Sequence, residues 1–344
     1  MRLRLAAGLT LALASATARA APPEPATNEP ELGFIVPLRW ENDATSSGFF
    51  TYSDSDRYYT AGQRLGRFMT ALRSVDGAGA LGELGRLFGA SRIGWGATPI
   101  ALDLYTPGDI TRSDAIPEDR PYAGWLRALA EVRLAWDRSH PLRGRLALSM
   151  GVVGPASFGE QAQRVTHELI SAPDPRGWSH QVGRGGNLVV PQFTAGLEQR
   201  IVELRRSRLA LSLWWHAALE LGRAEGSTGL GATLRAGLMG ARFGDSREGV
   251  EVVVFARLQG RAVAWNLFLA GGGGSHGVAG VPFVLETEWG LSLRFGRLFL
   301  HFAALSWSRE QAAPPPPTGP WRHLADRSPW FEHQFGRLEI GWVL

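Results

Sequence analysis

The stretch RLALSLWWHAALELG at residues 208–222 has the alternation that indicates the fold most clearly. Apolar side chains occupy every second position of this stretch: Leu209, Leu211, Leu213, Trp215, Ala217, Leu219 and Leu221. The opposite face carries polar side chains, namely Ser212, His216 and Glu220. A period of two is that of a β-strand with one apolar face. The stretch is also roughly two to three times longer than a common strand of about five or six residues, as in barrels that cross a membrane.

The same alternation recurs along the rest of the chain. It is clear in residues 126–136 and 189–198, and the last strand again has an apolar residue at every second place up to Leu344. The pattern predicts strands near 34–43, 57–72, 91–104, 121–136, 144–155, 187–203, 208–222, 229–243, 249–268, 281–295, 297–309 and 330–344. Single-chain bacterial barrels have an even number of strands. We therefore expect an all-β protein, an antiparallel transmembrane β-barrel of about twelve strands.

The connections between these strands differ in length. Short links are predicted at 137–143, 205–207, 245–248 and 296, and long loops at 44–56, 105–120, 156–186, 269–280 and 310–329. Outer-membrane barrels place short turns on the periplasmic side and long loops outside. The link at 73–90 is long for its side, and we expect a small helix around Leu81–Phe88. Aromatic girdles at the two interfaces are predicted from Trp40, Trp95, Trp125, Trp178, Trp289 and Trp342.

The first twenty residues predict export. Arg2 and Arg4 precede a short apolar run, and Ala18-Arg19-Ala20 is a small-x-small cleavage site. Such a segment is typical of a secretory signal peptide and is too short to span a membrane. We expect a signal peptide at 1–20, an N-terminal tail at 21–32 and the barrel at 33–344. A barrel with this leader belongs in the outer membrane of a Gram-negative cell.

Composition excludes several classes of function. The chain of 344 residues has no Cys, which rules out disulfides, thiolate metal ligands and thiol nucleophiles. Every cationic side chain is Arg. Three of the 36 cations lie in the leader, which leaves 33 against 32 acidic residues. The mature chain is therefore nearly neutral, and its charge does not predict binding to nucleic acid.

Residues 157–170 break the period of two and predict one helix within an extracellular loop. Ser157 and Glu160 are spaced as a capping box. An apolar stripe at helical spacing is expected to pack on the barrel: Phe158, Ala162, Val165 and Leu169. Gln163 and His167 lie one turn apart on a second stripe. They could face a site between the helix and the wall, or His167 could be an ordinary packed histidine.

Four linked motifs resemble the outer-membrane lipid A 3′-O-deacylase family (LpxR-like). The first two are Glu41-Asn42-Asp43 and DRYYTAG at 56–62. EDRPYAGW at 118–125 is the third. The fourth joins GPA at 154–156, Gln163-x-x-x-His167 and Gly177-Trp178. These motifs keep the family's order between about residues 41 and 181, and the rest of the chain is similar mainly as barrel strands.

The resemblance implies a twelve-stranded barrel that hydrolyses the 3′-linked acyloxyacyl ester of lipid A with calcium. It implies that His167 is the general base that activates water and that Gln163, Asn42, Asp43 and Thr60 are the other catalytic residues. The family's acidic residue after the histidine aligns with Pro173, so either its neighbour Asp174 acts as a metal ligand with Asp43 and Asn42, or one metal ligand is missing. Carboxylate and amide oxygens are ligands that Ca²⁺ prefers.

Position on the outer loops suggests further contacts with lipid A. Arg57, Arg120 and Arg164 could bind its phosphates, since Arg pairs with phosphate through two hydrogen bonds. Each could equally belong to a solvated charged rim, and Asp119-Arg120 could be an internal ion pair. Trp178 could line an acyl-chain groove or anchor the protein at the membrane interface.

Consecutive positions pose a geometric question for Asn42 and Asp43. Neighbouring side chains point to opposite faces of a regular strand. By alternation Phe34, Val36, Leu38 and Trp40 share the Asn42 face, whereas Arg39 and Glu41 share the face of Asp43. Both can serve one site only if the strand ends or bulges there. Otherwise one of the two, Asn42, only positions the rim.

Other functions remain open at this point. A non-enzymatic barrel, either a channel or a scaffold, could use the same motifs to pack its rim. A serine phospholipase would need a serine within reach of a histidine, and neither Ser157 nor Ser179 has a familiar spacing. A soluble periplasmic β-protein would also alternate.

Overall fold

The computed structural model describes residues 32–42, 58–136, 142–239, 249–312 and 333–344. Twelve long strands form one antiparallel sheet within these residues: β1 (Phe34–Asn42), β2 (Tyr58–Met69), β4 (Arg92–Thr106), β5 (Ala123–Ala135), β6 (Leu142–Val153), β7 (Leu188–Arg206), β8 (Leu209–Gly222), β9 (Glu225–Leu238), β10 (Val250–Asn266), β11 (Phe283–Phe295), β12 (Leu298–Trp307) and β13 (His333–Val343). Each strand pairs with its neighbours in sequence, and β1 pairs with β13, which closes the barrel. The two-residue β3 (Arg73–Ser74) extends the edge of β4.

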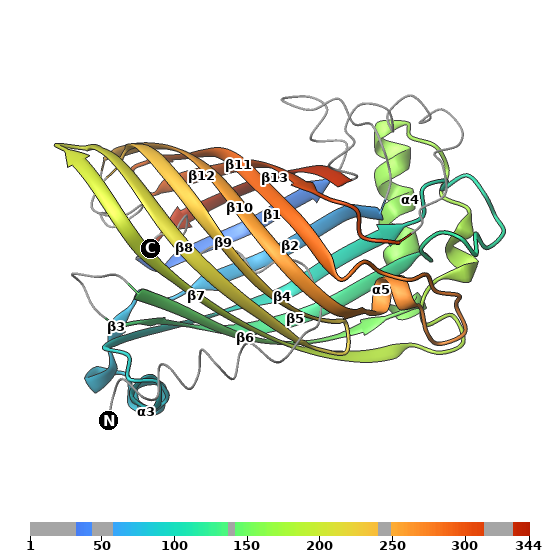
Figure 1. Ribbon diagram of the computed structural model, residues 1–344, viewed down its shortest axis with the longest axis horizontal. Coiled ribbons are helices and arrows are strands. Elements are labelled where there is room, and N and C mark those ends of the chain that lie inside the picture. Colours follow the sequence, from blue (N-terminus) through green and yellow to red (C-terminus); the bar gives the residue numbers. More distant parts are fainter. Residues whose placement is uncertain (1–31, 43–57, 137–141, 240–248, 313–332) are drawn as a thin grey trace.

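Helices lie at the two ends of the barrel (Figure 1). At one end, η2 (Val75–Gly77) and α3 (Gly79–Leu87) follow β3. The opposite end carries η3 (Pro155–Ser157), α4 (Gly159–Ile170), η4 (Gly177–His180) and α5 (Leu267–Ala270). The predicted small helix at 81–88 is confirmed by α3, and the predicted loop helix by α4. No helix among the described residues combines the length and apolarity needed to cross a membrane.

The alternation seen in the sequence sorts the side chains of each strand. On β8, Leu209, Leu211 and Leu221 are exposed on the outside, whereas His216 and Glu220 are buried in the lumen. An exposed apolar face and a buried polar face are the reverse of a soluble β-sandwich and fit a wall surrounded by lipid. The predicted twelve-stranded barrel is confirmed.

Ion pairs fill much of the lumen. Asp103 receives Arg64 and Arg127, each at 2.8 Å. Arg337 bridges Glu41 at 2.6 Å and Glu288 at 2.9 Å. These charges come from six strands, and each ion pair joins strands that are neighbours or next neighbours in the wall. Paired and hydrogen-bonded charges can remain ionised away from bulk water, where isolated ones could not.

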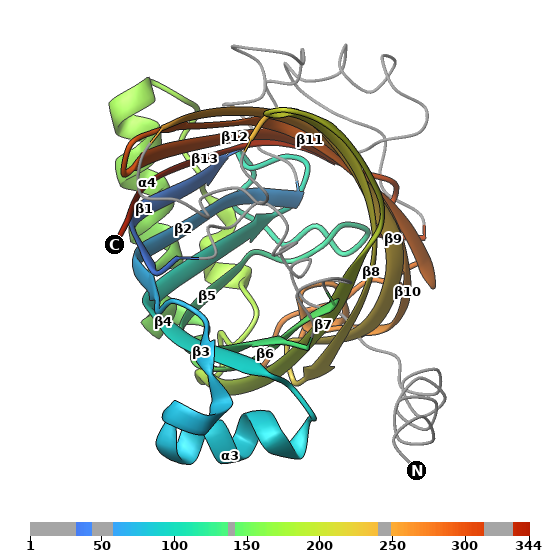
Figure 2. The ribbon, with the colours of Figure 1, turned by 90° about the vertical axis from the view of Figure 1, so that its left-hand side faces the viewer.

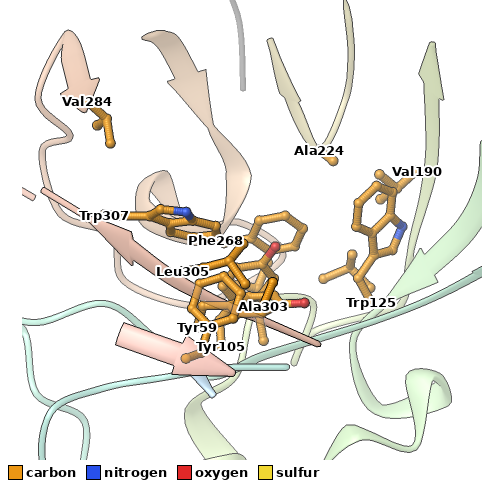
Figure 3. Packing of buried hydrophobic residues seen from close by; sticks show 14 of the residues in the cluster. Tyr59, Tyr105, Trp125, Val190, Ala224, Phe268, Val284, Ala303, Leu305 and Trp307 are labelled. Carbon is orange, nitrogen blue, oxygen red and sulfur yellow. The ribbon is translucent and has the colours of Figure 1, made fainter. Parts of the chain in front are cut away.

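An aromatic layer crosses the lumen beneath the end that carries α5 (Figure 3). Phe268 of α5 stacks on Tyr105 with ring centroids 4.2 Å apart and an interplanar angle of 12°. Tyr59 adds contacts to Trp307 and Phe335. Because α5 carries Phe268 into the barrel mouth, the aromatic layer and the ion pairs together occupy the described lumen.

The structure corrects several details of the predicted strands. A register shift between Ile35 and Leu38 on β1 turns Phe34 and Val36 into the lumen, so they do not share the outward face of Asn42. Leu38 and Trp40 do share it. Strand β9 begins at Glu225, four residues before the predicted start. The signal peptide and most of the tail lie outside the described residues.

The predicted aromatic girdles are right for only some of the tryptophans. Trp40, Trp95, Trp289 and Trp342 are exposed on the outer wall, as expected. Trp125 instead points into the lumen, where Arg127 lies 3.8 Å from its ring centroid. Trp178 is buried beneath α4. Neither of these two belongs to a girdle, because Trp125 takes the lumen face of β5 and Trp178 lies in η4 and not on a strand.

Candidate functional site

Two facing glycines let α4 approach the outside of the barrel wall. A Cβ at Gly124 of β5 would lie 2.3 Å from the Ser157 hydroxyl oxygen and 3.0 Å from the Cα of Gly159. A Cβ at Gly159 would in turn meet the Trp178 ring at 2.8 Å. The distances of 2.3 Å and 2.8 Å are shorter than real Cβ atoms show. The absence of side chains at these two positions therefore seats the helix against the wall (Figure 2).

The helix covers an apolar patch on the outer faces of β2 and β4. Ala61 and Leu104 form this patch with Ile110, Tyr122 and Trp178, and Ala162 of α4 packs on it. Ala61 and Leu104 are direct register partners. The patch therefore fixes the first two turns of α4 over the junction of these two strands.

Beside this patch, α4 buries a polar pair. Gln163 is 1% exposed and His167 is 4% exposed. The Trp178 indole N–H donates to Gln163 Oε1 at 2.7 Å. Since an indole N–H can only donate, this bond fixes the orientation of the amide and leaves its nitrogen facing His167. Gln163 Nε2 lies 3.4 Å from His167 Nε2.

The other imidazole nitrogen selects the tautomer. His167 Nδ1 lies 2.5 Å from the carbonyl oxygen of Pro173. A carbonyl can only accept a hydrogen bond, so Nδ1 carries the proton and donates. The lone pair of the neutral ring is then on Nε2, on the Gln163 side. A base oriented by a fixed acceptor on its second nitrogen is an arrangement suited to general-base catalysis.

The barrel wall contributes a second polar group next to the helix. Asn42 stands at the end of β1 on the outward face, yet it is only 6% exposed. Its Nδ2 donates to the backbone oxygen of Thr60 at 3.1 Å. The hydroxyl oxygens of Thr60 and Thr106 lie 2.6 Å apart. Buried amide and hydroxyl groups on the lipid side of a barrel are expensive unless paired, which marks the position as specialised.

Ala61 joins the two halves of the site. It is the register partner of Asn42 on β1 and belongs to the apolar patch on which Ala162 packs. Gln163 follows Ala162 directly. The structure therefore brings Asn42, Thr60, Gln163 and His167 to one region between α4 and the outer wall, as the sequence predicted. Asp43 lies outside the described residues.

The helix itself differs from its prediction in two respects. Residue Phe158 precedes the first turn with a left-handed backbone, and no side chain caps the helix. Ser157 instead accepts a hydrogen bond from the backbone N–H of Gly159, and Glu160 pairs with Arg164. The predicted packing stripe is also wrong, because Phe158, Val165 and Leu169 are exposed. Close approach at Gly159 rotates the Gln163 and His167 face onto the wall.

The predicted substrate-binding residues are placed unequally. Arg120 is buried and pairs with Glu310 at 3.0 Å, so a structural role replaces the predicted phosphate contact. Trp178 is equally buried and holds Gln163, so it lines no open groove. Arg164 is half-exposed and pairs with Glu160 on the polar side of α4, at 2.9 Å. Arg57 lies outside the described residues.

Oxygen atoms dominate the donors available for a metal ion near Asn42. The amide of Asn42 and the hydroxyls of Thr60 and Thr106 are all oxygen ligands of the kind that Ca²⁺ accepts. The described residues contain no group of three or more acidic or histidine side chains arranged to hold a metal ion. Asp174 is exposed and pairs with Arg176 at 3.5 Å. The donor chemistry near Asn42 fits a hard cation, and its negative charge would have to come from acids such as Asp43 and Asp174.

One serine does lie within reach of a histidine, but inside the barrel. Ser292 Oγ is 2.8 Å from His301 Nδ1, and the two residues are register partners on β11 and β12. Ser292 is fully buried, and His301 stacks on Phe255. A substrate in the membrane has no contact with this pair, because it faces the lumen. Sequence spacing missed it, since the two positions meet only through strand pairing.

The fold and the site define an outer-membrane β-barrel with a group of buried polar side chains on the outside of its wall. The family model of "Outer membrane protein LpxR" matches residues 5–314, and the chain belongs to this family. LpxR from Salmonella typhimurium has the same fold, with a TM-score of 0.68 at 17% sequence identity. The match covers 91% of this chain and 100% of that chain.

Other solved structures are more distant. The β-domain of the Bordetella autotransporter BrkA matches with a TM-score of 0.40 at 11% identity, covering 90% of this chain and 96% of its own. The outer membrane enzyme PagL matches with a TM-score of 0.25 at 13% identity, covering 44% of this chain and 88% of its own. No curated protein sequence matches the chain.

Proposed function

We propose that this protein is a lipid A deacylase that hydrolyses the 3′-linked acyloxyacyl ester of lipid A in the outer leaflet. The observation that carries the proposal is the oriented Gln163–His167 pair, which is buried on the outer side of the wall. An ester of a membrane lipid can reach that side from the leaflet itself. Membership of the LpxR family supports the same substrate.

His167 would act as the general base. Its Nε2 would take a proton from a water molecule as that water attacks the ester carbonyl, while Pro173 holds the proton on Nδ1. Collapse of the tetrahedral intermediate would break the bond to the sugar 3′-oxygen, which receives the proton back from His167. The products would be a free 3′-hydroxyl on lipid A and the two-chain acyloxyacyl acid. Gln163 would hold the imidazole and its water in place.

Calcium is part of the proposal. Asn42 would hold the ion with Asp43 and Asp174, and Thr60 would position Asn42 through the backbone bond. When bound, calcium supplies a positive charge that polarises an ester carbonyl and stabilises an oxyanion. We expect that chelation with EDTA abolishes the activity, that added Ca²⁺ restores it, and that Asp43→Asn weakens this restoration. Full activity in EDTA would remove calcium from the mechanism.

A channel is the weaker alternative. The aromatic layer around Phe268 and Tyr105 and the ion pairs beneath it occupy the described lumen. The polar pair of α4, by contrast, lies on the outside of the wall, where it cannot contact a solute that passes through the lumen. A scaffold without activity remains the competitor that experiment must exclude.

Mass spectrometry of lipid A tests the proposal. Cells that express the protein should lose the mass of one acyloxyacyl unit from lipid A, and cells with His167→Ala should not. His180→Ala is the matched control, since His180 lies in the same loop and its Nδ1 is 3.3 Å from Arg184 Nη1, away from the Gln163–His167 pair. Its lipid A should resemble that of the wild type. Unchanged lipid A in cells with a folded wild-type barrel and calcium would favour the scaffold.

A further inference from the structure

The exposed surface of α4 is apolar where a water-facing helix would be polar. Leu169 is 80% exposed, and Phe158 and Val165 are exposed by more than half. These three residues lie on one side of the helix and the residue before it, and they are here called the α4 stripe. Burying polar residues while exposing apolar ones reverses the usual pattern of a surface helix. The same reversal characterises the barrel wall, whose exposed apolar face contacts lipid.

Three faces of α4 follow from its sequence. At 100° per residue, the packed face of Gly159, Gln163 and His167 lies about 120° from the α4 stripe. Glu160, Arg164 and Glu168 form a third, charged face about 120° from both. A helix that lies flat at a membrane surface beside a protein wall needs these three faces: one for the wall, one for lipid and one for water.

The orientation of α4 meets this requirement. Figure 1 shows its axis running across the barrel axis at the end of the strands, and Figure 2 shows it outside the ring of strands. The barrel axis is the membrane normal. The helix therefore lies roughly parallel to the membrane plane at the outer rim.

The lipid-facing surface of the wall begins just beside the helix. Ala61 and Leu104 are register partners beneath α4, and Leu65 and Ile100 are partners four residues further along the same outward faces. Four residues of strand span about 13 Å at 3.3 Å each. Leu65 and Ile100 are each more than 40% exposed. The apolar band that surrounds the barrel thus begins within about 13 Å of the patch that α4 covers.

We propose that the α4 stripe is inserted among the acyl chains of the outer leaflet, so that α4 is an in-plane membrane helix. The occupant of this surface is bulk lipid, not a second protein. The Gln163–His167 face then lies at the level of the lipid headgroups, with charged Arg164 and Glu168 above it. This membrane contact does not depend on the proposed esterase activity.

Site-directed spin labelling tests the inference cleanly, because the chain contains no Cys. Single variants Val165→Cys and Leu169→Cys would carry a nitroxide on the α4 stripe. Glu168→Cys is the matched control, one residue from Leu169 but on the charged face, and Leu65→Cys is a control on the lipid-facing wall. Each variant would be reconstituted in liposomes of outer-membrane lipid, and collision rates with apolar O₂ and polar nickel–EDDA would be measured.

The expected result is that labels at 165 and 169 collide more with O₂ than with nickel–EDDA, as at 65, and that the label at 168 does the reverse. Nickel–EDDA collisions at 165 and 169 as frequent as at 168 would mean that the stripe faces water, which overturns the proposal. Low collision rates with both reagents would also overturn it, because they would show a protein cover such as a second copy. Lipid A hydrolysis, measured separately, does not enter either outcome.

Discussion

Helices α3 and α4 lie against the outside of the same part of the barrel wall, at its opposite ends, yet they bury opposite kinds of side chain. The α3 end packs apolar groups on the wall, including Ile93 of β4 and Leu134 of β5. Helix α4 also contacts β4 and β5, but it buries Gln163 and His167. Figures 1 and 2 show both helices outside the ring of strands.

The comparison of α3 with α4 indicates how a functional site on a barrel wall can be recognised. Apolar packing alone is sufficient to hold a short helix on the wall, as α3 demonstrates. Helix α4 instead buries an amide and an imidazole and leaves its apolar stripe exposed. Packing on the wall alone does not explain this polar face. Trp178 and Pro173 supply hydrogen-bond partners that make this burial tolerable.

The largest loss of activity is expected when a buried polar side chain of α4 is replaced by an apolar one, as α3 has. His167→Leu replaces the buried imidazole with an apolar side chain of similar size. Activity on lipid A should fall on the order of 10²–10⁴-fold, the usual contribution of a general base. The barrel should still fold, because the change leaves only the Pro173 carbonyl and the Gln163 amide nitrogen without the imidazole as partner, at a cost of about 1–3 kcal/mol for each group. Retained activity would mean that the buried pair is structural.

Truncation under α3 should produce the opposite result. Ile93→Ala removes a buried side chain between α3 and β4 and should lower the free energy of unfolding by roughly 2–5 kcal/mol. The activity of the folded fraction should not change. Ile100→Ala is the matched control, since Ile100 lies on the same strand but is exposed. A smaller loss is expected there in urea titrations of the reconstituted barrel, and an equal loss would show that α3 does not pack Ile93.

A smaller effect is expected from the residue that positions Gln163. Trp178→Phe keeps the ring beneath α4 but removes the N–H that fixes the amide. The lost hydrogen bond, worth about 0.5–1.5 kcal/mol, predicts a kcat lower by a factor of about 2 to 13, with little change in KM. Trp289→Phe on the outer wall should have no effect. A higher KM at constant kcat would assign Trp178 to substrate binding instead.

The smallest effect concerns charge on the exposed side of α3. A hydrogen bond from Arg86 lowers the pKa of Glu83 below its ordinary value of 4.5. A lowered folded pKa means that the pair stabilises the helix above about pH 4.5 and that this contribution is lost as pH falls through the lowered value. The free energy of unfolding of the wild type should fall slightly between neutral and acidic pH, and Glu83→Gln should not show this fall. Identical pH profiles for the two proteins would show that this exposed pair contributes nothing.

Sequence alone was sufficient for the barrel because each long strand repeats the same alternation many times. A single irregular residue does not alter such a repeat, so the strand positions were predicted well. The register shift near Pro37 was not predicted, since a bulge leaves no mark in composition, and it reversed the faces of Phe34 and Val36. Trp125 was misplaced for a similar reason.

The sequence predicted which residues form the site better than it predicted their geometry. Motif resemblance named Asn42, Thr60, Gln163 and His167, and the structure brings them together. Helical spacing chose the wrong packing face for α4, because apolar residues usually face protein. Two signals could have corrected this choice: Gly124 and Gly159, which permit close approach, and the barrel prediction itself, which puts lipid outside. Pro173 was taken as a missing acid, whereas its carbonyl orients His167.

The filled lumen has a consequence for the cell that carries this protein. Phe268, Tyr105 and the arginine–carboxylate pairs beneath them occupy the inside of the described barrel. We therefore expect that many copies in the outer membrane would not open a route for bile salts or hydrophilic antibiotics. We expect expression to leave sensitivity to large polar drugs unchanged.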